Sequence, residues 1–156
     1  MYRLPSVRFS AFLSCAVVAS VLLVLARPVC AQSDPVIYND AAFVSQSVPT
    51  TMEAGRPYLV SLTLQNTGTT TWSLEDMYCL GAESPLNNML WGGRAWLWTP
   101  VAPGETGTFT FLIFTPASAG TYPFQWRMVQ ETIEWFGEFT PAVNVTVVPP
   151  GNQAGP

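Results

Sequence analysis

Histidine and lysine, which many active sites require, are both absent from this 156-residue sequence. Without them the chain cannot build a Ser-His-Asp or Cys-His site, a histidine-bound zinc or iron centre, or a lysine Schiff base. The glycines of Trp91-Gly92-Gly93-Arg94 lack the spacing and the lysine of a phosphate-binding loop. We therefore predict no cofactor and no catalytic residues of these kinds.

Acidic residues offer the remaining route to catalysis. A pair of carboxylates can hydrolyse a glycoside, and three glutamates lie close together in the sequence at Glu131, Glu134 and Glu138. They lie around a short predicted strand and hairpin, where charged side chains normally face water. We therefore favour a protein that is not an enzyme, and we keep a hydrolase only as a hypothesis to be refuted.

A second acidic group could bind calcium. Glu75, Asp76 and Glu83 could supply hard oxygen ligands from one loop region. Their spacing does not match an EF-hand loop, so the favoured interpretation is a solvated acidic loop. We predict no metal site.

Tryptophans are the residues most able to contact a ligand. Trp91, Trp96 and Trp98 lie within eight positions, and Trp96 and Trp98 are two residues apart, so they project from one face of a strand. If that face is exposed, two indoles about 7 Å apart could stack on sugar rings or on the apolar side chains of a partner. If it faces inward, both belong to the core and Leu97 lies outside. We favour the core, because aromatic side chains must fill a sandwich that has no disulfide.

Trp135 presents the same ambiguity. It is followed directly by Phe136, and adjacent strand residues face opposite ways. One of the two is therefore expected near the surface, which makes Trp135 a fourth candidate for ligand contact.

The first 31 residues have the pattern of a secretory signal peptide. A basic start with Arg3 and Arg8 precedes an uncharged apolar stretch over residues 9–26. Val29 and Ala31 supply the small residues that precede a cleavage site. Cleavage is the favoured interpretation, and an uncleaved segment would act as a membrane anchor. We expect the domain in the secreted fraction or in the periplasm and cell envelope.

Cleavage would change the charge and the cysteine content of the chain. The remaining 125 residues would carry ten acidic side chains and three arginines, a net charge of −7. Such a chain should repel nucleic acids and anionic headgroups, which leaves proteins and neutral glycans as partners. Membrane contact is expected only if the signal segment is not cleaved. Cys79 would be the single remaining cysteine, so we predict no disulfide and a small buried thiol there.

Short apolar runs that alternate with polar residues fill most of the remaining chain. The clearest examples are residues 58–65, 107–114, 121–129 and 142–147, and weaker ones are 42–48, 77–81, 94–98 and 133–139. Period-2 alternation is typical of half-buried antiparallel strands. Seven or eight such strands predict an all-β fold of two packed sheets, with Trp126 at its centre. The predicted organisation is a signal peptide over 1–31, a linker over 32–41, the sandwich over 42–148 and a flexible Pro/Gly tail over 149–156.

Two turns between these strands have distinct chemistry. Asn66 and Thr67 can bond to the nearby backbone, and Gly68 is expected to supply a positive φ. Pro103-Gly104 suits a type II turn, with glycine at the position that needs positive φ. We interpret both turns as determinants of the fold.

Several motifs occur in the order found in one known family. They are NTGTTTW at residues 66–72, VAPGET at 101–106, the stretch from Pro116 to Tyr122 leading to Trp126-Arg127-Met128, and Phe136-Gly137. This set resembles the four-tryptophan Ig-like domain, which is found in a selective-autophagy receptor and in bacterial secreted proteins. The resemblance runs from about Phe43 to Val147 and implies an Ig-like β-sandwich.

The resemblance also assigns individual positions. Trp72 and Trp126 stand at two of the four family tryptophans, whereas Leu62 and the Phe139-Thr140 pair stand where the other two are expected. The matched positions to which it gives a structural role are Asn66, Gly68, Trp72, Pro103, Gly104, Gly120, Tyr122, Trp126 and Gly137. The stretch at 124–131 is similar to bacterial versions, which often accompany secreted hydrolases as non-catalytic modules. We therefore predict an exported Ig-like binding or assembly module that recognises a protein through an edge strand or an aromatic surface, with carbohydrate binding through Trp91, Trp96 and Trp98 as the alternative.

Overall fold

The computed structural model describes residues 36–151. The predicted signal peptide and the last residues of the predicted tail lie outside this range. Within it the chain forms ten strands and no helix, which confirms the all-β prediction. None of these residues belongs to an apolar helix long enough to cross a bilayer.

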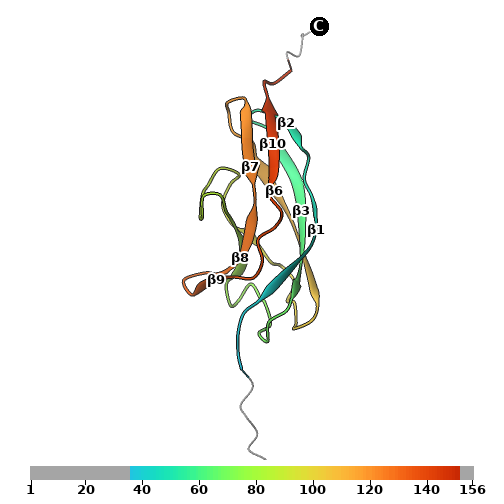
Figure 1. Ribbon diagram of the computed structural model, residues 1–156, viewed down its shortest axis with the longest axis vertical. Helices are drawn as coiled ribbons and strands as arrows, with labels where there is room; N and C mark the ends of the chain where they lie inside the picture. The colour runs from blue at the N-terminus through green and yellow to red at the C-terminus, as the bar shows by residue number, and fades with distance from the viewer. Residues whose placement is uncertain (1–35, 152–156) are drawn as a thin grey trace, which may run out of the picture. The chain divides into compact units, whose positions relative to one another are not determined.

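The strands are short and follow one another along the chain (Figure 1). They are β1 (Ala41–Ser47), β2 (Thr51–Glu53), β3 (Pro57–Asn66), β4 (Tyr78–Ala82), β5 (Ala95–Trp96), β6 (Thr106–Phe114), β7 (Gly120–Phe124), β8 (Trp126–Gln130), β9 (Glu134–Phe136) and β10 (Val143–Val148). All strands predicted from alternation are present, with shifted ends.

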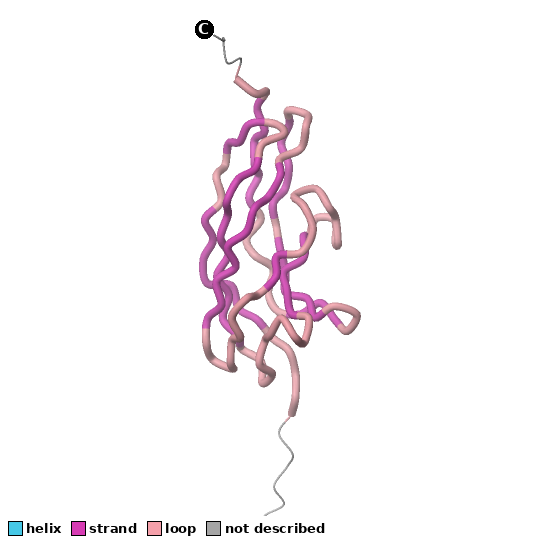
Figure 2. Tube along the Cα trace, turned by 180° about the vertical axis from the view of Figure 1, so that it is seen from behind, coloured by secondary structure: helices cyan, strands magenta, loops and turns pink. Residues whose placement is uncertain are grey.

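Two layers of strands make a sandwich (Figure 2). One layer is the antiparallel sheet β1-β3-β6. The other layer consists of two sheets, β2-β10-β7 and β5-β4-β8-β9. Strands β7 and β8 are separated only by Gln125, so the chain passes directly from one of these sheets into the other.

The single strand predicted over residues 121–129 is therefore two strands. The break occurs because the chain changes partner at Gln125: β7 pairs with β10, whereas β8 pairs with β4 and β9. At this point Thr140 donates its backbone N–H to the Trp126 carbonyl and accepts the Trp126 N–H on its hydroxyl. Thr140 thus holds the start of β8 on the side away from β4, where β9 does not reach.

Two further elements differ from the prediction. The three-residue strand β2 was not predicted, and it forms because Met52 pairs in parallel with Val147 of β10. Conversely, the strand predicted over 94–98 shrinks to Ala95–Trp96, since only these two residues pair with β4.

The core lies between the layers and is filled by the inward faces of the alternating strands. Val60, Leu62 and Leu64 of β3 are buried, as their spacing predicts. Trp126 occupies the centre, with ring centroids 4.9 Å from Phe111 and 5.8 Å from Phe124. The prediction that Trp126 fills the core is confirmed.

Candidate binding groove

The free edge of β6 is the first component of the candidate site. In an antiparallel pair, alternate residues direct their backbone N–H and C=O groups toward the partner strand and away from it. Asn66 donates to the Glu105 carbonyl and Thr115 donates to the Arg56 carbonyl, so the odd-numbered residues of β6 face β3. The even-numbered residues therefore direct their backbone groups outward.

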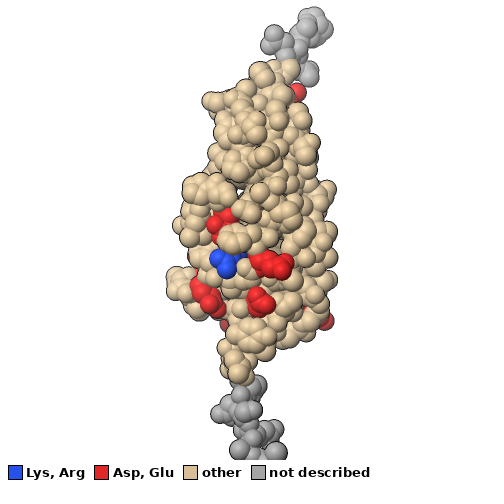
Figure 3. Space-filling model, in the orientation of Figure 1, with Lys and Arg blue, Asp and Glu red and all other residues tan. Residues whose placement is uncertain are grey.

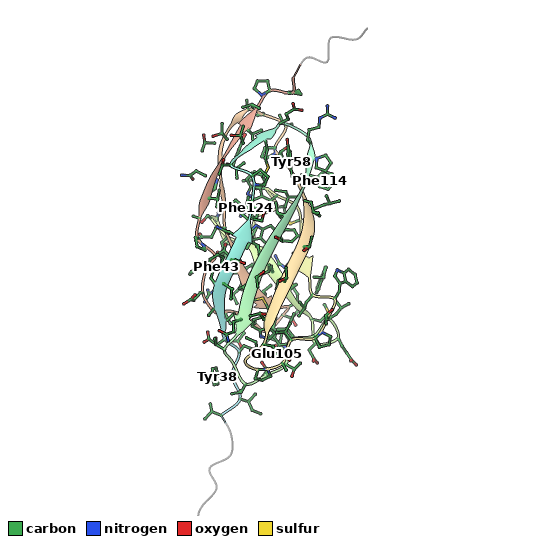
Figure 4. The ribbon with its side chains drawn as sticks, turned by 90° about the vertical axis from the view of Figure 1, so that its right-hand side faces the viewer. Tyr38, Phe43, Tyr58, Glu105, Phe114 and Phe124 are labelled. Atoms are coloured by element: carbon green, nitrogen blue, oxygen red, sulfur yellow. The ribbon has the colours of Figure 1, made fainter. Side chains whose placement is uncertain are left out.

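Almost all of these outward groups lack a protein partner. Within the described part of the chain, one of them makes a backbone hydrogen bond: the Phe114 N–H donates to the Trp91 carbonyl at 3.3 Å. The outward residues Thr106, Thr108 and Thr110 make no such bond. Figure 4 shows β6 alongside β3, with Glu105 and Phe114 near its two ends. An edge of this kind is a template on which another strand can add.

A groove of about 640 Å³ lies against this edge. One wall is β6 with the turn before it, over residues 104–110. The other wall is the segment 96–101, which contains Trp96 and Trp98. The volume falls within the roughly 300–1,000 Å³ typical of ligand sites.

The tryptophans expected to form one cluster lie in three different environments. Trp98 is 79% exposed, Trp96 is half-buried, and Leu97 between them is only 3% exposed. The favoured prediction that Trp96 and Trp98 face the core was therefore wrong for Trp98, because Leu97 takes the inward position. Both tryptophans line the groove.

Trp91 belongs to the core. It is 1% exposed, and its indole N–H donates to the Pro123 carbonyl at 2.8 Å. Its ring packs edge-on against Phe124 and Tyr122. The prediction that Trp91 contacts a ligand at the surface was therefore wrong. Its side chain is buried and holds strand β7.

Trp135 lies apart from the groove, on β9. Phe136 is buried and Trp135 is half-buried, as their alternation predicts. The Arg94 guanidinium stacks over the Trp135 ring at 5.0 Å, and the ring lies so close to Gly81 that a β-carbon there would clash with it. Much of the indole surface is thus already used within the domain.

The turn motifs noted in the sequence hold one end of the segment 96–101. Trp72 and Val101 exchange two backbone hydrogen bonds of 2.9 Å. The buried Asn66 side chain donates to the Thr70 and Val101 carbonyls at 2.8 and 3.0 Å. The segment 96–101 is therefore fixed to β3 at its end, so this wall is preorganised.

The two turn glycines have different roles. Gly104 has φ of +85° and the Glu105 N–H donates to the Ala102 carbonyl, which confirms the type II turn. Gly68 does not have a positive φ, so that prediction was wrong. A β-carbon at Gly68 would lie 2.7 Å from backbone atoms of Tyr38 and Asp40, and glycine is needed for this close approach.

The three glutamates considered for hydrolysis each have a separate structural partner. Glu131 pairs with Arg94, Glu134 accepts a hydrogen bond from the Asn39 amide at 2.8 Å, and Glu138 accepts one from the Phe43 N–H at 2.9 Å. Figure 3 shows acidic side chains gathered on the half of the domain that carries β8 and β9. None of these three glutamates lines the groove.

The residues considered for calcium are separated by a strand. Glu75 and Asp76 precede β4 and Glu83 follows it, so they lie at opposite ends of a five-residue strand. Among the described residues no three ligand-type side chains come close enough to hold a metal ion.

Glu83 is buried, with only 6% of its surface exposed, and one of its carboxylate oxygens has no hydrogen-bond partner. Burial raises the pKa of Glu83 above its usual value of 4.5, while the nearby Arg127 opposes the rise. Desolvation therefore disfavours the charged form of this carboxylate.

Cys79 is buried, as predicted. Burial raises the pKa of its thiol to about 12, and the negative charge of Glu131 adds to the rise. A thiol with this pKa stays protonated at neutral pH and is a poor nucleophile.

The fold and the groove together define an Ig-like β-sandwich with an open sheet edge at β6. Comparison with family models agrees: the model described as "Ig-like domain from next to BRCA1 gene" matches residues 47–147. The chain belongs to this family. A search of curated proteins found no match. Ig-like sandwiches are widely used as binding scaffolds. Membership of the family establishes the fold, and the function must be inferred from the site.

Sequence reasoning found the tryptophans of the groove but missed its other wall. Thr106, Thr108 and Thr110 looked like the polar face of a strand, and alternation does not reveal which strand stands at a sheet edge. The lack of charged residues in β6 is no signal of an edge, because β1, β3 and β10 also carry none.

Proposed function

We propose that this chain is an exported, non-catalytic Ig-like module that binds a protein partner by accepting an extended segment along the edge of β6. The observation that carries the proposal is the groove itself. It joins a row of outward backbone groups at Thr106, Thr108 and Thr110 to two tryptophans that supply apolar contact. Backbone hydrogen bonds to an added strand give affinity, and side-chain pockets give selectivity.

The finer classification is part of this proposal. Trp72 and Trp126, both fully buried, support a chain of the four-tryptophan type in which two tryptophans remain. Export and a bacterial source rest on the apolar N-terminal segment and on the resemblance of residues 124–131. A module of this kind would attach to a partner in the cell envelope or outside the cell.

Exposed Trp98 favours carbohydrate binding as a second candidate. An exposed indole can stack on a sugar ring, and neutral glycans are compatible with the acidic chain. Two coplanar exposed indoles would favour carbohydrate binding more strongly, but Trp96 is half-buried and Trp91 is in the core. The protein partner is therefore preferred.

A peptide library displayed on phage tests the proposal directly. The library is panned on the full chain, and the recovered peptides are measured against Thr110→Pro. Proline at 110 removes an outward N–H without removing a hydrogen bond to β3, so the sheet should form while an added strand loses a donor. We expect peptides that bind the wild type and bind Thr110→Pro at least tenfold more weakly.

Two controls keep the test interpretable. Thr110→Val retains the N–H and should retain binding, and Thr108→Pro should repeat the loss at the next outward position. Unfolding temperatures of all variants establish that each is folded. Peptides that bind the wild type and both proline variants equally, or no enriched peptide at all, would contradict binding at the β6 edge.

A further inference from the structure

The walls of the groove are neutral at every position except one. The tryptophan wall contains Trp96, Trp98 and Pro100, and the β6 wall contains three threonines. The exception is Glu105, in the turn that precedes β6. Its carboxylate accepts one hydrogen bond, from the Ala102 N–H at 3.1 Å, and is exposed.

The arginines of the described chain are engaged elsewhere. Arg56 pairs with Glu53 at 3.6 Å, and Arg94 pairs with Glu131. Arg127 donates to the Gly137 carbonyl at 3.0 Å and stacks on Phe139 at 4.7 Å. Arg56, Arg94 and Arg127 are absent from the lining of the groove, so the charge of Glu105 has no counter-charge within it.

An aromatic face and a carboxylate that line the same groove are suited to a cation. The Trp98 indole is exposed and lines the same groove as Glu105. A lysine or arginine side chain can lie over an indole through its quadrupole while its charged end approaches a carboxylate. A purely apolar side chain would use the indole and leave the carboxylate uncompensated.

We propose that the segment bound at the β6 edge carries a lysine or arginine that stacks on Trp98 and pairs with Glu105. This inference rests on the proposed function and specifies the chemistry of the partner: an extended, basic peptide segment. The cation selects the partner, whereas the backbone of β6 supplies the sequence-independent part of the binding. Because the pair is exposed, binding weakens as salt concentration rises.

Panning the same phage library on three targets tests this inference. The targets are the wild type, Glu105→Gln and Trp98→Leu, and the recovered sequences are compared. Among peptides whose binding requires the Thr110 N–H, we expect lysine and arginine to be enriched at one position for the wild type and not for Glu105→Gln or Trp98→Leu. Glu75→Gln, which removes an exposed charge outside the groove, should preserve the enrichment.

A double-mutant cycle measures the pair itself. In a peptide from the wild-type selection, replacing the basic residue by norleucine should weaken binding to the wild type roughly tenfold. The same replacement should change binding to Glu105→Gln by less than about threefold. Equal losses for both targets would show that the cation does not interact with Glu105 and would overturn the inference.

The failures of the two proposals are distinguishable. Peptides that require the β6 edge but show no basic residue would overturn this inference and leave the proposed function standing. An absence of edge-dependent peptides would remove both. If cellohexaose or xylohexaose at millimolar concentration displaces the peptides and quenches tryptophan fluorescence in the wild type but not in Trp98→Leu, the groove binds a neutral glycan and the basic peptide is excluded as its occupant.

Discussion

The two edges of the sheet β1-β3-β6 differ in whether another segment covers their backbone groups. At the β1 edge, the Glu138 N–H donates to the Ala41 carbonyl at 2.7 Å, and the Glu138 carboxylate accepts the Phe43 N–H. A register shift between Phe43 and Ser45 further disturbs that edge. At the β6 edge, no segment between residues 36 and 151 makes a backbone hydrogen bond to the outward groups of Thr106–Leu112.

This difference separates backbone groups that stabilise the fold from backbone groups that remain available to a partner. Natural sheets protect their edges with charges, bulges or covering loops, because an open edge recruits other strands. The β1 edge uses a bulge and a covering segment at Glu138, so its backbone groups contribute to the stability of the domain. The β6 edge has neither a bulge nor a hydrogen-bonded covering segment over Thr106–Leu112, and this supports its assignment to partner binding.

Gly137→Ala should disrupt the covered edge most strongly. Gly137 has φ of +73°, and a β-carbon there would lie 2.5–2.7 Å from Ala41 atoms. Strain and overlap together should lower the free energy of unfolding by about 3 kcal/mol. Gly55→Ala is the matched control, because Gly55 has φ of +67° with open space around it, and it should cost about 1 kcal/mol. Equal losses in chemical denaturation would show that β1 is not held by this contact.

Glu138→Ala should have a smaller effect at the same edge. Loss of the hydrogen bond to the Phe43 N–H should lower the free energy of unfolding by about 1 kcal/mol. Glu138→Gln retains an acceptor oxygen and should recover most of this loss. If the alanine and glutamine variants unfold at the same denaturant concentration, the hydrogen bond does not stabilise β1.

Glu83→Gln should have the opposite sign, because it removes a buried charge that desolvation disfavours. Its pKa is higher in the folded protein than the usual 4.5. Its contribution to stability is therefore full below pH 4.5 and decreases as the pH rises through the folded value. At pH 7 the glutamine variant should be more stable than the wild type, and the difference should shrink as the pH falls toward 4.5. Denaturation curves at several pH values check this, and a destabilised variant at pH 7 would contradict it.

Thr110→Lys should have the smallest effect on stability and a large one on binding. The side chain is exposed at an edge that the domain does not use, so the free energy of unfolding should change by less than about 0.5 kcal/mol. The edge-dependent peptides should nevertheless lose affinity, since lysine at an edge opposes strand addition. Phe109→Ala, at the buried neighbouring position, should cost about 3–5 kcal/mol and serves as the contrast. Similar losses for both variants in thermal unfolding would show that Thr110 is part of the packed structure.

The fold could be predicted from the sequence because its signals are local. Alternation located β3 and β6 within a residue or two, and Pro103-Gly104 indicated the turn between the groove walls. The site could be predicted only in part, because it depends on contacts between distant segments. Nothing local shows that Leu97 packs inward and turns Trp98 outward, or that the open edge falls on β6.

Amide hydrogen exchange measured by NMR tests the central claim most directly. The account predicts that the Thr108 and Thr110 amides exchange rapidly in the free protein, while those of Phe109 and Phe111 are protected by bonds to β3. Addition of an edge-dependent peptide should slow exchange at Thr108 and Thr110 and leave Phe109 unchanged. Protection of Thr108 and Thr110 in the free protein, equal to that of Phe109, would show that the edge is already covered and would contradict the account.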